Sequence, residues 1–506
     1  LNASMTLGMK KPGNPPALSA YQQKELRDLG IDETHLKKVF KTLAEGKTVG
    51  VFQLEGSGMT RFLKELKPTN IEDIIAMVSL YRPGPMELIP SFIRRKQGLE
   101  KVTYLHPALE PILKNTYGIM VYQEQLMQAA QALAGFSLPE ADTLRKAVGK
   151  KIKKLLLEQE AKFINGAERT IGSPRIAAEF WRLVEPFARY GFNRSHAAGY
   201  ATIAYQTAWL KTYYPVEFMT SLLNSDSKNI DRITFLVAIA AQEGIPILAP
   251  HINESRAGFA VTDKTKIRFG LAAIKNVGHN VVSTIIEERD KNGPFNSLSN
   301  FLDRIWSRDL NKKSLEALTK SGALDIFGER NHILENMERI RDYTRESRRD
   351  GIDQHSLFGL LPDASSLPEL KLLEAEPATQ MQKLNWEKEL LGLYLSGHPL
   401  NALAKTAPSA KSIKLIKEKM NRSNVKVVCI LSAVKRILTK QGEPMVFLKL
   451  QDATDEIEGV AFPSTLKMYG HLLEPDKCFL VEGKVNERNG VPSMICNTFE
   501  LLEAKA

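Results

Sequence analysis

Tyr190-Gly191-Phe192-Asn193-Arg194-Ser195-His196 is the stretch around which the chain is organised. It places aromatic rings, an amide, a guanidinium, a hydroxyl and an imidazole directly before an apolar run with helical character, residues 201–210. The start of a helix offers free N–H groups to an anion, and an arginine adds a bidentate fork for phosphate. The residues leave two interpretations open: a polyphosphate site with Tyr190 as a stacking surface, or an ordinary helix capped by Ser195.

Length, charge and cysteine content limit the class of protein. At 506 residues the chain exceeds the size of one core, and roughly three or four domains are expected. The net charge of +11 favours a polyanionic partner. No apolar run reaches membrane-spanning length and no signal peptide is visible, so we expect a cytoplasmic protein without membrane contact. Three cysteines without C-x-x-C spacing predict reduced core thiols and no zinc site.

The part of the chain before residue 229 has a helical and basic pattern. Its periodicity predicts helices over residues 21–43 and 71–80, with a short buried strand over Thr48–Leu54. Two prolines in Tyr81-Arg82-Pro83-Gly84-Pro85 fix the backbone, which is typical of a rigid binding loop. The cluster Arg94-Arg95-Lys96 is best explained as a solvated helix face.

The densest cationic run follows Asp142. We interpret it as a surface for a nucleic-acid backbone or a triphosphate, because clustered lysines and arginines attract phosphate. Its members are Arg145, Lys146, Lys150, Lys151, Lys153 and Lys154.

Four motifs in fixed order carry a family resemblance. Val49–Glu55, Tyr81–Pro85, Val121–Gln125 and Tyr190–His196 resemble the fingers domain of bacterial replicative C-family polymerases, the DNA polymerase III alpha subunits. In that family the last motif lies against the incoming nucleotide. The resemblance therefore implies nucleotide binding by Tyr190, Asn193, Arg194, Ser195, His196, Arg145, Lys146 and Lys150, and DNA binding by Arg82 and Lys151. It also implies a leader at the junction of palm and fingers over residues 1–46 and a fingers domain over residues 47–240.

Residues 241–345 carry two candidate helix-hairpin-helix motifs. Val277-Gly278, ahead of a helix over residues 281–288, has the pattern of a tight glycine turn that presents N–H groups to a DNA phosphate. A weaker copy spans Leu315–Asp325, and its glycine taken alone is better explained as a helix cap. The family places a duplex-binding pair here, so we predict DNA contacts from Lys275, Val277, Gly278, His279 and Gly322. A short hairpin is expected over residues 259–269.

Gln354-His355-Ser356-Leu357-Phe358 stands in a polar region. A Leu-Phe pair without a core of its own has to fold back or insert into a partner's pocket. The peptide resembles the one by which bacterial polymerases hold the ring-shaped sliding clamp, which implies clamp contacts from Gln354, Ser356, Leu357 and Phe358. Residues 346–424 are assigned to this peptide and to linker helices, one of them over residues 386–395.

The last domain, residues 425–506, has an all-β pattern. Five short strands with a helix over residues 464–472 predict an OB-fold, a platform for single-stranded nucleic acid. Phe447 and Phe462 are equally good core residues, so strand binding stays open. The predicted fold class is multidomain and mainly α, with fingers and tandem helix-hairpin-helix domains followed by a C-terminal all-β OB-fold.

Polymerase chemistry needs groups that the sequence does not contain. Two metal ions about 4 Å apart are normally held by carboxylates, and no Asp-x-Asp, Walker A loop or histidine cluster occurs. The resemblance implies that the palm and phosphoesterase domains precede the fingers. We therefore expect the C-terminal portion of a polymerase, inactive by itself, whose Mg²⁺ ligands lie outside this chain. Expected partners are dNTP, primer–template DNA, the sliding clamp and other replicase subunits.

Two alternatives remain. A noncatalytic scaffold that tethers DNA to the clamp would share the hairpins, the clamp peptide and the β-domain, but would not need nucleotide-contacting loops. The error-prone C-family polymerase is similar through the fingers, and the peptide at residues 354–358 favours the replicative form over it.

Overall fold

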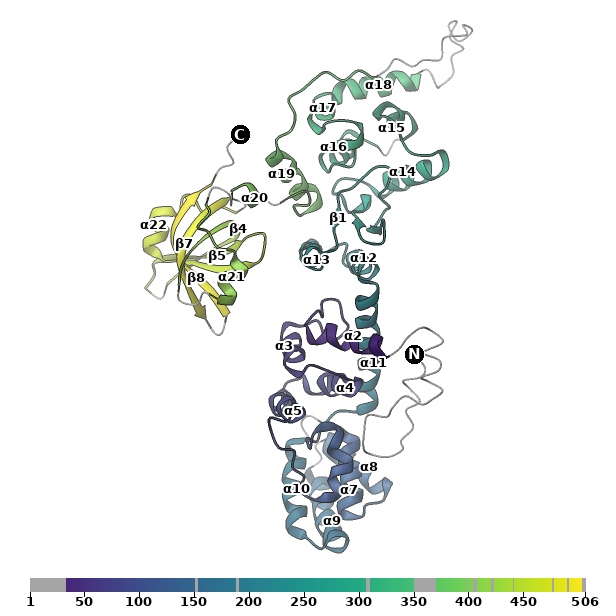
Figure 1. Ribbon diagram of the computed structural model, residues 1–506, viewed down its shortest axis with the longest axis vertical. Helices are drawn as coiled ribbons and strands as arrows, with labels where there is room; N and C mark the ends of the chain where they lie inside the picture. Colours follow the sequence, from purple (N-terminus) through teal and green to yellow (C-terminus); the bar gives the residue numbers. More distant parts are fainter. Residues whose placement is uncertain are drawn as a thin grey trace. The chain divides into compact units, whose positions relative to one another are not determined.

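The computed structural model describes residues 33–150, 153–187, 191–305, 310–349, 370–397, 399–403, 407–419, 423–439, 441–475, 477–488 and 491–502. The chain divides into two compact units, Leu1–Phe218 and Met219–Ala506. Helices make up the first unit and the beginning of the second, and a closed five-stranded barrel ends the chain (Figure 1). The predicted fold class, mainly α with a C-terminal all-β domain, is confirmed.

The first unit consists of helices joined by short loops. Helix α4 has the bounds that the sequence predicts. The α-helices are α2 (Glu33–Ala44), α3 (Ser57–Leu66), α4 (Ile71–Leu80), α5 (Ile89–Lys96), α6 (Glu110–Leu113), α7 (Gln123–Ala134), α8 (Leu138–Lys150), α9 (Lys153–Ile171), α10 (Pro174–Phe187) and α11 (Arg194–Tyr213). The 3-10 helices are η2 (Pro85–Leu88), η3 (Pro107–Leu109) and η4 (Lys114–Thr116), and α12 (Pro215–Ser225) crosses the boundary to the second unit.

Helix α11 packs on α4 in the first of two cores. Its buried face is made of alanines, Ala197, Ala201, Ala204 and Ala208, whose small side chains let the apolar helix α4 approach closely. The spacing of these alanines follows the helical repeat, so one face of α11 is committed to packing.

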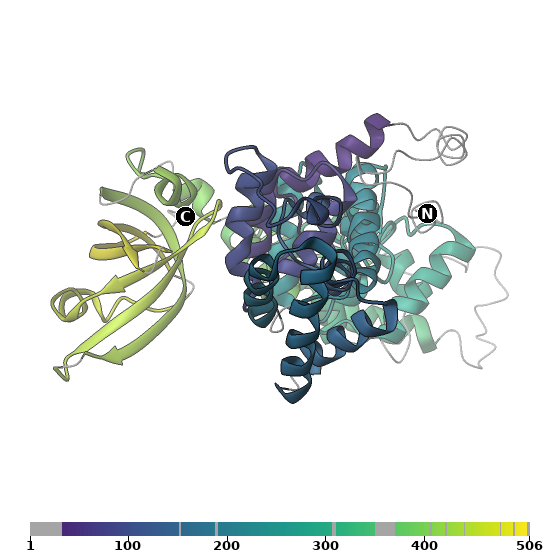
Figure 2. The same ribbon diagram turned by 90° about the horizontal axis from the view of Figure 1, so that it is seen from below.

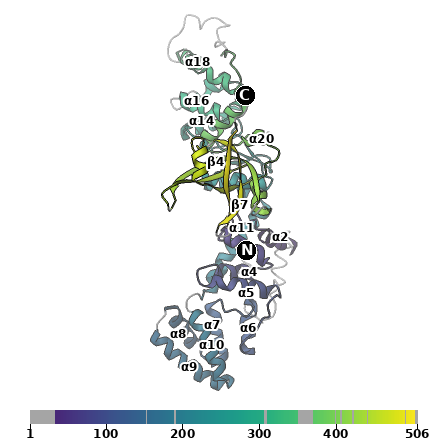
Figure 3. The same ribbon diagram turned by 90° about the vertical axis from the view of Figure 1, so that its left-hand side faces the viewer.

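Helices α7 to α10 form the second core. They lie side by side in Figures 1 and 3. Phe163 of α9 is fully buried, and its ring stacks on Phe180 of α10 at a centroid distance of 5.5 Å. This core supports α7 and α8, which carry two of the sequence motifs.

The prediction of a strand over Thr48–Leu54 is wrong. The segment folds as consecutive turns, in which Val51 N donates to Thr48 O and Leu54 N donates to Val51 O. Gly50 and Gln53 have φ values of 77° and 61°, and such left-handed residues cannot continue a strand. Val51 and Leu54 are buried as expected, which is why the segment resembled a core strand.

The second unit begins with helices and a small sheet. The hairpin expected over residues 259–269 is confirmed, since β2 (Ala260–Val261) pairs antiparallel with β3 (Ile267–Arg268) while β1 (Ile247–Leu248) adds in parallel. The other elements are α13 (Ile230–Gln242), η5 (Leu271–Ala273), α14 (His279–Asn292), α15 (Leu298–Ile305), α16 (Lys312–Lys320), η6 (Asp325–Phe327), α17 (Arg330–Glu335), α18 (Met337–Arg349), α19 (Gln380–Leu391), α20 (Leu400–Leu403) and α21 (Ile413–Lys419).

The helix expected over residues 386–395 begins and ends earlier than predicted. Thr379 caps the N-terminus of α19, because its Oγ1 accepts a hydrogen bond from Gln382 N. In turn, Gln382 Oε1 accepts a hydrogen bond from Thr379 N. Gly392 ends the helix with φ of 80°, a left-handed conformation that glycine adopts without strain.

The barrel has the strand order β4-β5-β6-β8-β7 and closes through the pairing of β4 with β7. Figure 2 shows its curved strands. Cys429 and Cys496 are buried in its core, and all three cysteines are free. Burial raises the pKa of Cys496 to about 12, so this thiol stays protonated. The elements are β4 (Asn424–Leu438), β5 (Pro444–Gln451), β6 (Glu456–Ala461), α22 (Pro463–Tyr469), β7 (Cys478–Arg488) and β8 (Val491–Leu501).

Among the described residues, no helix has both the length and the apolar character needed to cross a bilayer.

Candidate functional site

Phe192 joins two motifs that are far apart in the sequence. Its N–H donates to Val121 O at 3.1 Å, and its carbonyl accepts from Gln123 N at 2.8 Å. These bonds make a short parallel bridge between Tyr122 and Phe192, immediately before α7 and α11 begin. This bridge holds the starts of the two helices together.

Asn193 caps α11. Its Oδ1 accepts a hydrogen bond from His196 N at 2.9 Å. The cap of α11 is therefore Asn193, two residues before Ser195, which the alternative interpretation expected to cap the helix. Ser195 and His196 are both exposed. The first turn of α11 therefore presents its hydroxyl and imidazole to solvent.

Arg194 is held by two carboxylates from other helices. Its Nη2 donates to Glu72 Oε1 of α4 at 2.6 Å, and its backbone N–H donates to both carboxylate oxygens of Glu124 in α7, at 3.2 and 3.1 Å. Burial would lower the pKa of Arg194, but the Glu72 carboxylate outweighs it and raises that pKa. The Arg194 side chain is still 42% exposed, so a phosphate can reach it.

Arg82 supplies a second guanidinium at the same place. It lies 4.0 Å from the centroid of the Phe192 ring, and its Nε donates to Ser79 O at 3.2 Å. Burial lowers its pKa. The rigid loop Tyr81–Pro85 and the stretch before α11 therefore meet, as a shared binding site requires.

The cationic run of α8 reaches the site through Gln123. Arg145 Nη1 lies 3.5 Å from Gln123 Oε1, and Gln123 Nε2 donates to Gly191 O at 3.1 Å. Asp142 neutralises part of the run, since it forms ion pairs of 2.7 Å with both Arg145 and Lys146. The Lys150 side chain, Lys151 and Tyr190 lie outside the described residues, so their predicted contacts remain predictions.

A row of rings follows the exposed face of α11. Successive centroids are 5.6 Å apart for Phe192 and His196, 4.5 Å for His196 and Tyr200, and 5.4 Å for Tyr200 and Phe52. Phe52 is 37% exposed. The sequence reasoning did not assign Tyr200 or Phe52 to the site, although the i, i+4, i+8 spacing of Phe192, His196 and Tyr200 was a signal for one face.

Glu72, Glu124 and Tyr122 also belong to this site and were not selected from the sequence. Glu72 and Glu124 anchor Arg194, and Tyr122 lies with its ring centroid 5.8 Å from the guanidinium carbon. Tyr122 and Glu124 stand in a quoted motif, Val121–Gln125, whereas Glu72 stood in a helix without any visible functional pattern.

The basic cluster of α5 is engaged within the protein. Arg94 and Arg95 form ion pairs with Glu100 at 2.8 and 2.7 Å, and Lys96 pairs with Asp73 at 2.8 Å. This cluster is therefore a helix face with its own counterions. It is not the solvated face expected from the sequence, because the side chains of Arg95 and Lys96 are only 20% and 10% exposed.

Glu100 makes the stability of this region depend on pH. Hydrogen bonds from Ser91, then from Arg95 and Arg94, lower the pKa of Glu100 to about 2 from 4.5. A lowered pKa stabilises the fold above the unfolded-state value, and this contribution disappears as pH falls from about 4.5 to about 2. We expect Glu100→Gln to be less stable than the wild type at neutral pH and equally stable near pH 2. Urea unfolding of both proteins across this range measures the difference, and a difference that does not vary with pH would contradict the assignment.

The first hairpin presents an open helix start. Gly278 is the N-terminal flanking residue of α14, which has no side-chain cap, and Lys275, Gly278 and His279 are exposed while Val277 is buried. The turn differs from expectation in one respect. Its left-handed residue is Asn276, with φ of 69°, whereas Gly278 has φ of −72° and space around its Cα. Gly278 is thus required neither by its backbone angle nor by a neighbouring atom of the chain.

The second hairpin has its glycine buried and hydrogen-bonded within the protein. Gly322 is buried with φ of 86°, its N–H donates to Thr319 O at 3.0 Å, and a Cβ would lie 2.4 Å from the Arg330 guanidinium. Arg330 is bound by the Asp325 carboxylate at 2.8 Å. Gly322 therefore ends a helix beside a buried arginine, and it has no exposed group with which to make the DNA contact predicted for it.

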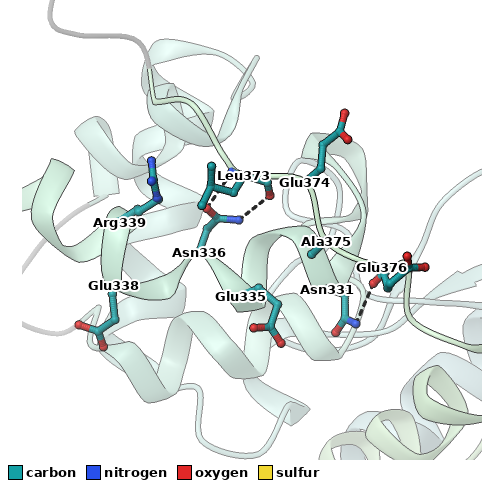
Figure 4. Close-up of a pocket in the computed structure, with 9 residues that line it drawn as sticks. All are labelled: Asn331, Glu335, Asn336, Glu338, Arg339, Leu373, Glu374, Ala375 and Glu376. Carbon is teal, nitrogen blue, oxygen red and sulfur yellow. Dashed lines mark hydrogen bonds between the residues drawn. The ribbon is translucent and has the colours of Figure 1, made fainter.

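A cavity of about 580 Å³ lies elsewhere in the second unit, between α17, α18 and the extended segment that begins at residue 370 (Figure 4). Asn336 holds this segment with two hydrogen bonds to the Leu373 backbone, at 2.8 and 2.9 Å. The lining is acidic and is unsuited to a polyphosphate. It comprises Asn331, Glu335, Asn336, Glu338, Arg339, Leu373, Glu374, Ala375 and Glu376.

Two further predictions lie outside what the structure tests. The clamp peptide, Gln354–Phe358, is outside the described residues. In the barrel, Phe462 is 43% exposed and Phe447 is half-buried, so neither belongs to the barrel core, and single-strand binding remains a prediction. Within the described ranges, no group of three His, Cys, Asp or Glu residues comes together as a metal site.

Three protein families match separate parts of the chain. Residues 19–170 match the bacterial DNA polymerase III alpha subunit finger domain, residues 244–334 match a helix-hairpin-helix motif, and residues 425–502 match an OB-fold nucleic acid binding domain. The five-stranded barrel agrees with the last match. Each of these domains was predicted from the sequence.

The chain spans about two fifths of the length of the relatives that it matches. DNA polymerase III subunit alpha of Bacillus subtilis is 42% identical over 92% of the chain and 41% of its own length. The Xylella fastidiosa subunit is 41% identical over 88% of the chain and 39% of its own length. The Thermus aquaticus subunit is 40% identical over 92% of the chain and 39% of its own length. Over its finger, helix-hairpin-helix and OB-fold domains, the chain therefore belongs to the family of bacterial DNA polymerase III alpha subunits.

Proposed function

We propose that this chain is the part of a replicative DNA polymerase that binds the incoming dNTP and the primer–template duplex. The observation that carries the proposal is the position of Arg194. Its side chain is partly exposed at the start of α11, where the loop Tyr81–Pro85, the motif Val121–Gln125 and Arg145 of α8 also come together. The names of the similar proteins support DNA polymerisation as the activity of the full-length subunit.

The residues divide the work of binding a nucleotide. Arg194 would exchange the Glu72 carboxylate for a phosphate oxygen, since both are anions that accept a bidentate guanidinium bond. His196 and Tyr200, with rings 4.5 Å apart on the exposed face of α11, would contact the sugar or base. Arg82 would raise the local positive potential, and Arg145 would extend it toward the polyphosphate.

Mg²⁺ supplies the stabilisation of charge in nucleotidyl transfer, and its ligands are proposed to lie outside this chain. The carboxylates nearest to Arg194 do not fit that role here. Glu72 is bound to the Arg194 side chain and Glu124 to its backbone N–H. The described residues of the site are therefore assigned to holding and orienting the nucleotide.

For duplex DNA we assign the main contact to the first hairpin. The N-terminus of α14 is uncapped and exposed, and an uncapped helix start binds phosphate through its N–H groups. Lys275 and His279 flank it. The empty space around the Gly278 Cα lets a phosphate approach the backbone.

Substitutions of the two glycines separate binding from stability. Gly278→Val is expected to weaken duplex binding several-fold with little change in stability, because its side chain would occupy the phosphate position. Gly322→Ala is expected to destabilise the protein, because it combines a left-handed φ with a contact to Arg330. Fluorescence anisotropy with a DNA duplex and thermal unfolding measure the two effects. Duplex affinity unchanged in Gly278→Val would contradict the assignment.

The sliding clamp, other replicase subunits and a cytoplasmic location complete the proposal. The peptide Gln354–Phe358 supports the clamp, by its resemblance and its place after the hairpins. A noncatalytic scaffold is the second candidate, and it would use the hairpins and barrel without Arg194. Single-nucleotide incorporation by the full-length subunit carrying Arg194→Ala distinguishes the two, because a scaffold would be unaffected.

A further inference from the structure

The Tyr122 hydroxyl is buried without a hydrogen-bond partner among the described residues. Tyr122 is 2% exposed, and within that part of the chain its hydroxyl oxygen meets neither a donor nor an acceptor. A buried hydroxyl in this state is unfavourable, and the large majority of buried polar atoms in proteins are paired. The neighbours of Tyr122 are the functional groups just described, so the unpaired hydroxyl lies in the candidate nucleotide site.

Two observations connect this hydroxyl to the ion pair of Arg194. The guanidinium carbon of Arg194 lies 5.8 Å from the centroid of the Tyr122 ring, and the same guanidinium binds Glu72 at 2.6 Å. Burial, followed by the charge of Glu72, raises the pKa of Tyr122. Glu72 is therefore the carboxylate that acts most strongly on a hydroxyl that remains protonated and able to donate.

We propose that Glu72 exchanges partners when a nucleotide binds, leaving Arg194 to the phosphate and accepting a hydrogen bond from the Tyr122 hydroxyl. This exchange rests on the proposed function of Arg194. Without nucleotide, Glu72 holds the guanidinium in position and neutralises it. With nucleotide, the phosphate takes over the guanidinium, and Glu72, which is only 16% exposed, would otherwise be a poorly solvated charge beside an anion.

The exchange makes Tyr122 a positioning residue for nucleotide binding. In the part of the chain that the structure describes, the hydroxyl has no partner without nucleotide, and it gains one in the complex. Its hydrogen bond therefore contributes to binding alone. A hydrogen bond to a charged group changes an equilibrium by about tenfold or more. Removing the hydroxyl is therefore expected to weaken nucleotide binding without weakening the fold.

The experiment uses single-turnover incorporation by the full-length subunit on a primer–template, which yields the dNTP Kd and the maximum rate separately. Tyr122→Phe is expected to raise the Kd about tenfold, with a smaller change in rate and an unfolding temperature no lower than that of the wild type. In a Glu72→Gln background, Tyr122→Phe is expected to change the Kd much less, because the charged acceptor is gone.

Tyr205→Phe is the matched control. The Tyr205 hydroxyl is also buried and has no partner among the described residues, but its ring packs on Phe40, where α11 meets α2. This variant is expected to retain the wild-type Kd. An unchanged Kd in Tyr122→Phe, with Arg194→Ala still impaired, would overturn the exchange and leave the proposed function standing. An unchanged Kd in Arg194→Ala would overturn both.

Discussion

Replacing Arg194 by alanine is expected to raise the dNTP Kd of the full-length subunit by about 10- to 150-fold. The range corresponds to the loss of one hydrogen bond between charged groups, about 1.5–3 kcal/mol. Arg194 is the partly exposed cation at the start of α11, and the substitution also leaves Glu72 without its counterion beside the phosphate. The measurement is single-nucleotide incorporation on a primer–template at several dNTP concentrations.

A control variant distinguishes this site from a general change in charge. Arg61→Ala removes another arginine of the first unit, one that is 68% exposed and pairs with Glu65 at 3.9 Å. It is expected to leave the Kd unchanged, because the interactions described for Arg61, with Glu65 and with the Phe62 ring, do not involve α11. Arg194→Lys keeps the positive charge but loses the bidentate guanidinium. Its dNTP Kd is expected to lie between those of Arg194→Ala and the wild type. Equal loss of affinity in Arg61→Ala and Arg194→Ala would show that the effect is not local.

Asp73→Ala is expected to destabilise the helix that carries Glu72, by about 3–5 kcal/mol. Asp73 is 2% exposed, and its Oδ2 accepts hydrogen bonds from Thr69 N at 2.8 Å and Lys96 Nζ at 2.8 Å. Its backbone N–H also donates to the Asn70 cap. The substitution breaks a buried ion pair and a capping box together, and it leaves Lys96 charged and only 10% exposed.

Hydrogen exchange at the amides of α4 measures this effect within the intact protein. Exchange should become faster in α4 and remain similar in α9, which belongs to the other core of the first unit. Glu65→Ala removes a carboxylate that is 51% exposed, and it is expected to change stability by no more than about 0.5 kcal/mol. Protection of α4 that is the same in Asp73→Ala and wild type would refute the assignment.

Much of the fold was predictable because it depends on local patterns. Ile71–Leu80 follows a capping asparagine, Asn70, and contains the apolar run Ile74–Val78, and the structure has a helix there. The barrel followed from alternating strands separated by turns. The segment Thr48–Leu54 was not predictable in the same way, because its apolar residues are buried in turns with left-handed backbone angles.

The residues of the site were predictable only where they stood in a distinctive sequence motif. Arg194 and His196 stood in a distinctive stretch, whereas Glu72 reaches Arg194 across 122 positions of sequence and had no local signal. The same limit applies to Gly278 and Gly322. Both belonged to similar patterns, and only the surrounding atoms show that one is exposed and the other is buried against Arg330.

The most direct test of the nucleotide site is a structure of the full-length subunit with primer–template DNA and an incoming dNTP. We expect Arg194 to lie within about 2.7–2.9 Å of a phosphate oxygen, separated from Glu72, with the base or sugar near His196 and Tyr200. A triphosphate bound elsewhere, with Arg194 still paired to Glu72, would contradict the proposed function.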